Sequence, residues 1–246
     1  MVSATSTSPR PSQADIVIEG IKAMIMSGRL GPGARLPIEK DLAAQLGVSR
    51  GPLREGVRAL AILGILETRQ GDGTYLTDLD PLQLLGPLSF LADLQLPSNA
   101  GHLLAVRRVL ETETVAQAAL KMTDTELDEA GRILDSVAEM AEGELTQADL
   151  EAFIEADTQF HRLIARASGN PALAAMIESL VGRTYRARLW RAIRERGAVS
   201  STQAQHSAIL TELRRRDPER AKIRMAIHLL GVQDYADNHP NGDTDS

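Results

Sequence analysis

The sequence predicts a mainly α-helical protein, with a small N-terminal domain of three helices and one β-hairpin followed by a bundle of about seven helices. Of its 246 residues, 43% are hydrophobic but only 3% are aromatic. The core must therefore be built from Leu, Ala, Ile and Val, which favours packed helices over a β-sandwich. Helical spacing of the apolar residues dominates the chain between its polar ends. Only residues 65–77 read as a pair of strands.

Several classes of protein are excluded by composition. The chain has no cysteine, so it has no disulfide scaffold, thiolate metal site, iron–sulfur cluster or cysteine nucleophile. No uncharged apolar run approaches the roughly 18 residues of a membrane span. Residues 1–13 are rich in Ser, Thr and Pro and lack an apolar segment, which predicts a disordered leader rather than a secretory signal. Residues 236–246 are expected to form a disordered tail. We therefore expect a cytoplasmic protein with no membrane partner.

The N-terminal domain is predicted over residues 14–77. Its elements are three helices and a hairpin, at about 16–27, 42–46, 49–64, 65–68 and 74–77. A Gly/Pro turn follows the first helix, Gly47 stops the second, and a Gly-rich turn joins the strands. Three helices followed by a hairpin is the order of a winged helix-turn-helix, a DNA-binding plan.

The third helix carries a ridge of arginines. Arg50, Arg54 and Arg58 recur every four residues and so share one face. Residues near the start of such a helix reach base edges, so Arg50 and Arg54 are candidates for guanine contacts. Arg58 lies further along and is expected to meet phosphate, or else Glu55 and Glu67. The alternative is that the ridge is only a solvated face.

Further candidate DNA contacts flank this helix. Ser49 is placed to cap it. Lys40 on the preceding helix, Arg35 before that, and the tip of the wing at Gly71 would approach the DNA backbone. Charge agrees, because residues 10–77 carry 9 Lys/Arg against 7 Asp/Glu whereas residues 78–246 carry 18 against 26. A slightly basic domain on an acidic one predicts two domains with different partners.

The C-terminal domain is predicted over residues 78–235. Breakers such as Gly143, Pro171 and Pro218 separate its helical segments. The predicted helices are about 81–95, 99–121, 123–142, 146–168, 171–195, 201–215 and 218–235.

Histidines stand on the apolar faces of three of these helices. Asp157 and His161 lie four residues apart and project from one face, while His206 and His228 share stripes with aliphatic residues. If they converge, one Asp and three His form a mixed oxygen and nitrogen site for a divalent ion. The alternative is that each histidine is buried by itself and donates a hydrogen bond to a backbone carbonyl.

Two more polar residues are candidate ligand contacts. Arg107 lies three residues from both Leu104 and Leu110 and so points toward the core, where a guanidinium must be paired. It either clamps a ligand carboxylate or pairs with Glu111 one turn on. Asn170 either bonds a ligand or caps the next helix. Among the arginines between residues 183 and 194, one or two facing inward could add to the site.

The segment RLPIEKDLAAQLGVSRGPLREGVRALAILGILETRQGDGTYL resembles the DNA-binding domain of GntR-family transcription regulators. The resemblance covers about residues 14–77 and implies DNA contacts at Lys40, Ser49, Arg50, Arg54 and Gly71.

This chain departs from the family pattern at two glycines. Gly51 and Gly56 stand where the family more often has a larger side chain. The first removes a base contact, and the second is expected to weaken the helix by roughly 1 kcal/mol.

The C-terminal domain resembles the FCD ligand domain of the FadR subgroup. The matching segments are Asp157-Thr-Gln-Phe-His161, Ala-Ser-Gly-Asn170, His206 and His228-Leu. In metal-binding members, an Asp and three His at these positions hold a divalent ion. The resemblance therefore implies a metal site here, with zinc as the first choice and nickel, manganese or iron as alternatives.

The resemblance also extends to Val106-Arg107-Arg108-Val-Leu-Glu111, where the family's arginine meets an acid effector. It implies a homodimer on a palindromic operator. We expect a repressor of a catabolic operon, not an enzyme, controlled by a small organic or sugar acid. The alternatives are a metalloregulator that responds to the ion itself and a metal-dependent hydrolase.

Overall fold

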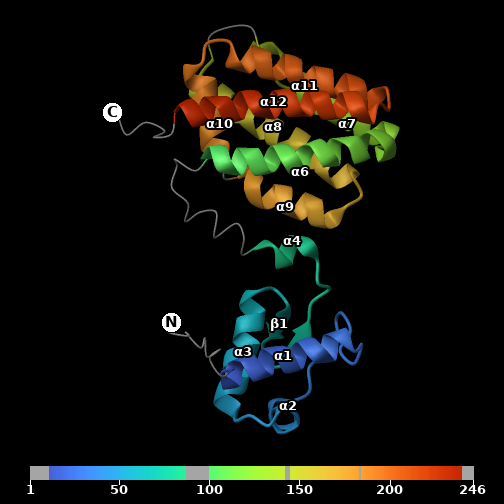
Figure 1. Ribbon diagram of the computed structural model, residues 1–246, viewed down its shortest axis with the longest axis vertical. Helices are drawn as coiled ribbons and strands as arrows, with labels where there is room; N and C mark the ends of the chain where they lie inside the picture. The colour runs from blue at the N-terminus through green and yellow to red at the C-terminus, as the bar shows by residue number, and fades with distance from the viewer. Residues whose placement is uncertain (1–10, 87–99, 142–144, 183, 240–246) are drawn as a thin grey trace, which may run out of the picture. The chain divides into compact units, whose positions relative to one another are not determined.

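The computed structural model describes residues 11–86, 100–141, 145–182 and 184–239. Its contacts divide the chain into two units, the head (Met1–Gly86) and the body (Pro87–Ser246) (Figure 1). The protein is mainly helical, with a two-stranded antiparallel sheet in the head. This confirms the predicted fold class. None of the helices in the described ranges is long and apolar enough to cross a membrane.

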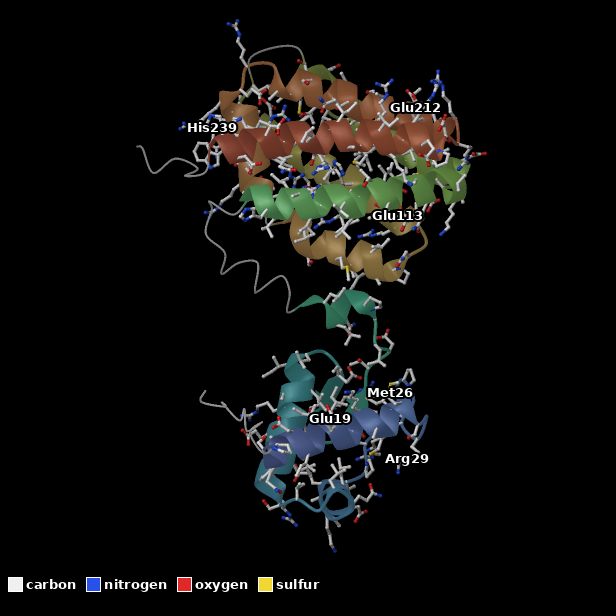
Figure 2. All side chains as sticks on the ribbon, in the orientation of Figure 1. Glu19, Met26, Arg29, Glu113, Glu212 and His239 are labelled. Atoms are coloured by element: carbon white, nitrogen blue, oxygen red, sulfur yellow. The ribbon has the colours of Figure 1, made fainter. Side chains whose placement is uncertain are left out.

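The head is a winged helix-turn-helix. Its elements are α1 (Gln13–Met26), α2 (Glu39–Leu46), α3 (Arg50–Ile62), β1 (Leu66–Arg69), β2 (Gly73–Leu76) and the short α4 (Pro81–Leu84). Ser12 and Asp15 form a capping box that starts α1, and Gly47 ends α2 with a φ of 66°. The strands pair with Leu66 opposite Leu76. Aliphatic side chains from α1, α2, α3 and both strands form the core of the head. Met26 at the end of α1 lies outside this core and is exposed (Figure 2).

Gly56 has a packing reason that its sequence context does not reveal. An added Cβ would lie 2.7 Å from Cβ of Val17 and 3.1 Å from the carbonyl oxygen of Ala14, both on α1. The missing side chain therefore lets α1 and α3 approach closely. Gly51, in contrast, has no neighbour within 4 Å of an added Cβ.

The body is a helical bundle. Its described elements are α6 (Ala100–Lys121), α7 (Asp124–Asp135), the 3₁₀ turn η2 (Ala138–Ala141), α8 (Gln147–Ala167), α9 (Pro171–Val181), α10 (Tyr185–Arg194), α11 (Ala198–Arg214) and α12 (Pro218–Asn238). The long helix α12 packs against α6 and α11, and α8 lies behind them (Figure 1). Capping boxes at Thr123 and Thr146 start α7 and α8.

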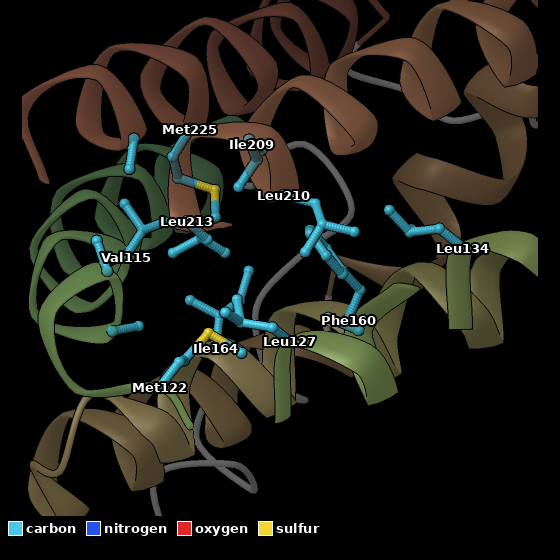
Figure 3. Packing of buried hydrophobic residues seen from close by; sticks show 14 of the residues in the cluster. Val115, Met122, Leu127, Leu134, Phe160, Ile164, Ile209, Leu210, Leu213 and Met225 are labelled. Carbon is cyan, nitrogen blue, oxygen red and sulfur yellow. The ribbon is translucent and has the colours of Figure 1, made fainter. Parts of the chain in front are cut away.

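Aliphatic side chains fill the main core of the body. Figure 3 shows Phe160 and Ile164 of α8 facing Leu213 of α11 and Met225 of α12. Phe160 also touches the ring of His206, with 4.9 Å between ring centroids. The polar cluster described below therefore lies against a dry hydrophobic core.

Three of the predicted helices need correction. Residues 171–195 do not form one helix: α9 ends at Val181 and α10 starts at Tyr185, because Thr184 turns inward as an acceptor for a buried guanidinium. Residues 123–142 form α7 and then the turn η2. The helix predicted from 201 begins at Ala198, directly after Gly197 with its φ of 83°.

The chain ends also differ from expectation where they are described. The last helix, α12, continues to Asn238, so the predicted tail begins as helix. Most of the leader, residues 1–10, lies outside the described residues. The same holds for most of the helix predicted over 81–95, of which the structure describes α4. By its contacts α4 belongs to the head, where Gln83 approaches Gly64.

Candidate metal centre and DNA-binding surface

Four buried side chains converge inside the body. Asp157 and His161 project from one face of α8, His206 comes from α11, and His228 comes from α12. One ligand atom from each lies within 4.8 Å of all the others. We call these four residues the His/Asp cluster. The structure thus brings together the side chains that the sequence singled out, and it does not leave the histidines isolated.

The imidazoles meet through their Nε2 atoms. Nε2 of His228 lies 3.2 Å from Nε2 of His161 and 3.3 Å from Nε2 of His206. Oδ1 of Asp157 lies 3.4 Å from Nε2 of His206 and 3.9 Å from Nε2 of His161. Three nitrogens and one carboxylate oxygen therefore surround one point.

Contacts on the far side of two rings favour a cation at that point. Nδ1 of His161 lies 2.5 Å from Oε2 of Glu111, and Nδ1 of His228 lies 3.0 Å from Oε1 of Gln205. An oxygen acceptor at Nδ1 places the ring proton there, which leaves the Nε2 lone pair bare. Bare lone pairs about 3 Å apart repel each other unless a cation lies between them. The donor set therefore fits a divalent metal ion.

Electrostatics favour the same protonation states. Burial lowers the pKa of His206 and His228 well below the usual value, and neighbouring histidines lower it further. Burial alone would raise the pKa of Glu111, but the charges of Arg107 and His161 lower it to about 2. His206 and His228 are thus neutral, beside an ionised Glu111.

Arg107 is connected to the cluster through Glu111. Its side chain is fully buried, and Nε donates to Oε1 of Glu111 at 2.6 Å while Nη1 donates to the hydroxyl of Thr184 at 2.6 Å. The pairing with Glu111 that the sequence left open is present. One nitrogen, Nη2, is buried without a hydrogen-bond partner among the described atoms. Since such a donor costs about 1–3 kcal/mol, it is a place for a polar ligand atom or water.

Arg188 and Arg191 of α10 are buried as well. Arg188 donates to Oδ2 of Asp157, and its Nη2 lies 3.1 Å from the hydroxyl of Thr158. Burial and the charge of Arg107 lower the pKa of Arg188 to about 9. The sequence placed one or two inward-facing arginines in this stretch without saying which, because only the packing of α10 decides it.

A small cavity lies beside the cluster. Its volume is about 20 Å³, and its lining includes Asp157, Arg188, Arg191, Thr202 and Val232. That volume holds about one water molecule. Carboxylate and guanidinium groups therefore line a space that a larger ligand could enter only if the surrounding helices shift.

Asn170 lies at the start of α9. Its Oδ1 accepts from the backbone N–H of Leu173 at 3.2 Å, which is the capping geometry that the sequence offered as the alternative to a ligand contact. Gln205, in contrast, was not singled out from the sequence. A glutamine in a helix carries no signal of its own, and only its spacing of one residue from His206 relates it to the site.

In the head, Arg54 and Arg58 of α3 line a groove of about 630 Å³ between the helices and the wing, whereas Arg50 is not part of its lining. Arg35, Arg54, Arg58, Arg69 and Gly71 contribute to its walls. The groove is therefore rich in guanidinium groups, as a surface for the DNA backbone requires.

Arg54 is held in place by an acid. Its Nε and Nη2 each lie 2.9 Å from a carboxylate oxygen of Glu39 on α2, and both side chains are exposed. Ser49 occupies the N-cap position of α3 but makes no side-chain capping bond, so the predicted cap is not formed there. Glu67 pairs with Arg69 rather than with Arg58.

The wing is fixed by Arg35. This side chain donates to the carbonyl of Asp72, and its Nε lies 2.7 Å from where a Cβ on Gly73 would stand. Arg69 lies over the ring of Tyr75, with 4.2 Å from its guanidinium carbon to the ring centroid. The tip around Gly71, with its φ of 75°, is thus presented by a rigid hairpin.

Comparison with known proteins decides the family. Residues 13–76 match the bacterial regulatory proteins of the gntR family, and residues 102–231 match the FCD domain. The chain belongs to the GntR family. The combination of the two domains fits the FadR subgroup, as the sequence resemblance implied.

Relatives and structures agree. The chain is 34% identical to the transcriptional regulator LutR of Bacillus subtilis (strain 168), over 86% of this chain and 95% of LutR. It is 30% identical to the transcriptional repressor NanR of Escherichia coli (strain K12), over 91% of this chain and 84% of NanR. Its fold matches a Streptococcus agalactiae GntR structure with a TM-score of 0.63 and 25% identity, over 90% of this chain and 99% of that one.

This GntR-family protein is therefore a DNA-binding transcription regulator and not an enzyme, because both matched domains and the relatives are those of regulators. The alternative of a metal-dependent hydrolase, which the sequence left open, is therefore wrong. The body contains a buried group that could hold a metal ion.

Proposed function

We propose that this regulator is a homodimeric repressor of a catabolic operon, acting on a palindromic operator in the cytoplasm. A small organic or sugar acid, bound beside a divalent metal ion in the body, controls its operator affinity. The similarity to NanR, which is described as a repressor, supports repression rather than activation of transcription. The single observation that carries the proposal is the buried His/Asp cluster flanked by two buried guanidinium groups.

The metal ion would be held by Asp157, His161, His206 and His228, with zinc as the first choice. Three imidazole nitrogens and one carboxylate oxygen suit zinc and also nickel, manganese and iron. When bound, the ion supplies two positive charges in a buried site. Glu111 and Gln205 fix the orientation of two of the imidazoles.

A count of the buried charges supports an anionic effector. Arg107, Arg188 and Arg191 carry three positive charges, and their partners Glu111, Asp157 and Glu195 carry three negative ones. Imidazoles that ligate a metal ion are uncharged and add none. This set is balanced before a metal ion is added, so a divalent ion leaves two buried positive charges uncompensated. Because uncompensated buried charge is costly, the metal-loaded body recruits an anion.

The chemistry around the cavity indicates a carboxylate as that anion. Arg188 lines the cavity, where a carboxylate can compete with Asp157 for its guanidinium. Nη2 of Arg107, which is not part of that lining, has no hydrogen-bond partner among the described residues. The cavity of about 20 Å³ is smaller than such a ligand, so its entry requires α10 to move away from α8. This displacement is our mechanism for coupling the effector to the rest of the dimer.

In the head, Arg50 and Arg54 would contact guanine bases, and Ser49, Lys40, Arg58, Arg35 and Gly71 would contact the backbone. A helix-turn-helix reads one half-site, so two heads in a dimer account for a palindrome. A coupling free energy of about 1–3 kcal/mol between effector and operator would change operator affinity by about 5–150-fold.

The size of the cavity also favours a second candidate function, in which the ion itself is the signal. A space for about one water admits no acid without rearrangement. In that case metal removal alone should change operator affinity, with no organic ligand present.

A thermal-shift panel of hydroxy acids, sugar acids and dicarboxylates, run with and without EDTA, tests the proposal. An acid at about 100 times its Kd should stabilise the protein by roughly 2.7 kcal/mol, or several degrees, and EDTA should erase the shift. If no acid shifts a protein whose bound metal is confirmed by mass spectrometry, the effector proposal is wrong. The metal-sensing candidate then replaces it.

A further inference from the structure

A second arginine of α10 reaches the small cavity beside the His/Asp cluster. Arg191 stands three residues after Arg188, and both line the cavity together with Asp157. Only 8% of the Arg191 side chain is exposed. Its Nη2 lies 3.8 Å from where a Cβ on Gly231 would stand, so the guanidinium reaches from α10 to α12. The wall of the cavity therefore presents two guanidinium groups.

The two arginines differ in how firmly they are held. Besides its bond to the His/Asp cluster, Arg188 donates to the hydroxyl of Thr158 at 3.1 Å and to the carbonyl of Val181 at 3.0 Å. Within the described ranges, the guanidinium of Arg191 makes a single hydrogen bond, from Nε to Oε2 of Glu195 at 2.6 Å. Both Nη nitrogens of Arg191 are thus available to a ligand.

Glu195 does little to neutralise Arg191. It is the C-cap residue of α10, and its side chain is 45% exposed. Water therefore screens its charge, and a carboxylate at the C-terminus of a helix is disfavoured by the helix dipole. A ligand carboxylate can accept from the two Nη groups of Arg191 without uncovering a buried acid. At Arg188, in contrast, it has to compete with the buried Asp157.

The charge of the metal-loaded site indicates how many carboxylates the effector has. A divalent ion leaves two positive charges uncompensated among the buried groups, as counted above. A monoacid cancels one of them, whereas a diacid cancels both. Because a buried charge without a counter-charge is costly, the count favours a dianion over a monoanion.

The remaining lining indicates what joins the two carboxylates. It is largely apolar, with buried side chains such as Ile154, Val199 and Val232. The hydroxyl of Thr202 is the one uncharged polar group of the lining within the described residues. A sugar acid would therefore place several hydroxyls where they find no partner, at a cost of about 1–3 kcal/mol each. An aliphatic spacer meets no such cost.

We propose that Arg191 binds a second carboxylate of the effector, and that the effector is a short dicarboxylate with an aliphatic spacer. Its first carboxylate lies at the metal ion and Arg188. Residues three apart on a helix have Cβ atoms about 5–6 Å apart, so a spacer of about two or three carbons suffices. This proposal rests on the proposed function and narrows its acid to one class.

The first experiment compares matched ligands by calorimetry on the metal-loaded full chain. Succinate and glutarate are each paired with the monoamide, which has the same size but lacks the second charge. Each diacid should bind about 10–100-fold more tightly than its monoamide. Arg191→Gln should weaken the diacids by that factor and change the monoamides less than twofold. Arg186→Gln, an exposed arginine of α10 outside the lining, is the control and should bind like the wild type.

The outcomes separate this proposal from the one on which it rests. Monoamides that bind as tightly as the diacids, or an Arg191→Gln variant with unchanged diacid affinity, overturn the dicarboxylate while leaving a metal-bound acid in place. The same holds if neither diacid binds but another acid of the thermal-shift panel does. If no acid of the panel binds to metal-loaded protein, the proposed function and the dicarboxylate both fail.

The second experiment predicts a gain in affinity, which a purely structural role of Arg191 does not. Glu195→Gln removes a negative charge beside the incoming carboxylate and should tighten diacid binding by about two- to fivefold. The exposed position of Glu195 preserves the fold. Unchanged or weaker diacid binding in Glu195→Gln contradicts the proposal. If Arg191→Gln loses metal together with helical circular dichroism, Glu195→Gln and the comparison of diacid with monoamide decide the question.

Discussion

The head and the body use their charged residues in opposite ways. In the head, Arg54 and Glu39 form an exposed ion pair. Other guanidinium groups line an open groove, where DNA phosphates can replace their present partners. In the body, Arg107 and Arg188 are buried and bonded to the carboxylates that contact the histidines. Exposed pairs contribute little to stability, whereas breaking a buried pair is costly. Substitutions in the head should therefore have independent effects. Substitutions in the body should have coupled effects, because its buried charges share partners.

The largest effect should come from removing a ligand of the cluster. His228→Ala leaves three of four ligands, so metal content after dialysis should fall from about one ion per chain to near zero. Metal analysis by mass spectrometry measures this. His239→Ala, at the exposed end of the same helix, is the control and should retain the ion. Full metal occupancy in His228→Ala would refute the site.

A change behind the ligands tests whether the body acts as a network. Glu111→Gln keeps the size of the side chain but removes the charge that holds both Arg107 and His161. Zinc affinity should fall by about 10–100-fold, as it does when a residue behind a metal ligand is altered. Competition with a chelating dye measures it, and an unchanged affinity would mean that Glu111 serves Arg107 alone.

In the head, the substitution of one arginine should change operator binding without affecting the metal site. Arg54→Ala should weaken operator binding by about 1–3 kcal/mol and relax the preference for guanine at one position of each half-site, while metal content stays the same. Fluorescence anisotropy against single-base operator variants measures both effects. Arg29→Ala, an exposed arginine after α1, is the control. Uniform weakening over all bases would instead assign Arg54 to phosphate.

Two glycines on α3 should respond with opposite signs. Gly56→Ala forces a Cβ against Val17 and should destabilise the head by about 1–3 kcal/mol. Gly51→Ala meets open space and should stabilise the helix by up to about 1 kcal/mol. Thermal unfolding measures both changes. Equal effects would contradict the close contact between α1 and α3.

The difference between head and body also explains what could be predicted from the sequence. The elements of the head follow from local signals such as Gly47 and the Gly-rich turn of the wing, so their order was correct. In the body, the spacing of Asp157 and His161 and the apolar stripes around the other histidines indicated that four side chains meet.

Contacts that depend on the packing of distant helices could not be predicted. The break at Thr184 exists because Arg107, 77 positions earlier, needs an acceptor. The burial of Arg188 depends on the packing of α10 against α8, where Asp157 and Thr158 accept hydrogen bonds from it. Gly56 looks unfavourable for helix formation until Val17 is placed against it.

The central claim is that an acid and a metal ion in the body jointly control the head. The most direct test measures operator affinity by fluorescence anisotropy, with the acid found in the thermal-shift panel, for metal-loaded, EDTA-stripped and reloaded protein. We predict that the acid changes the Kd by about 5–150-fold in the loaded and reloaded protein and leaves it unchanged in the stripped protein. An equal response without metal, or no response with it, would contradict the account.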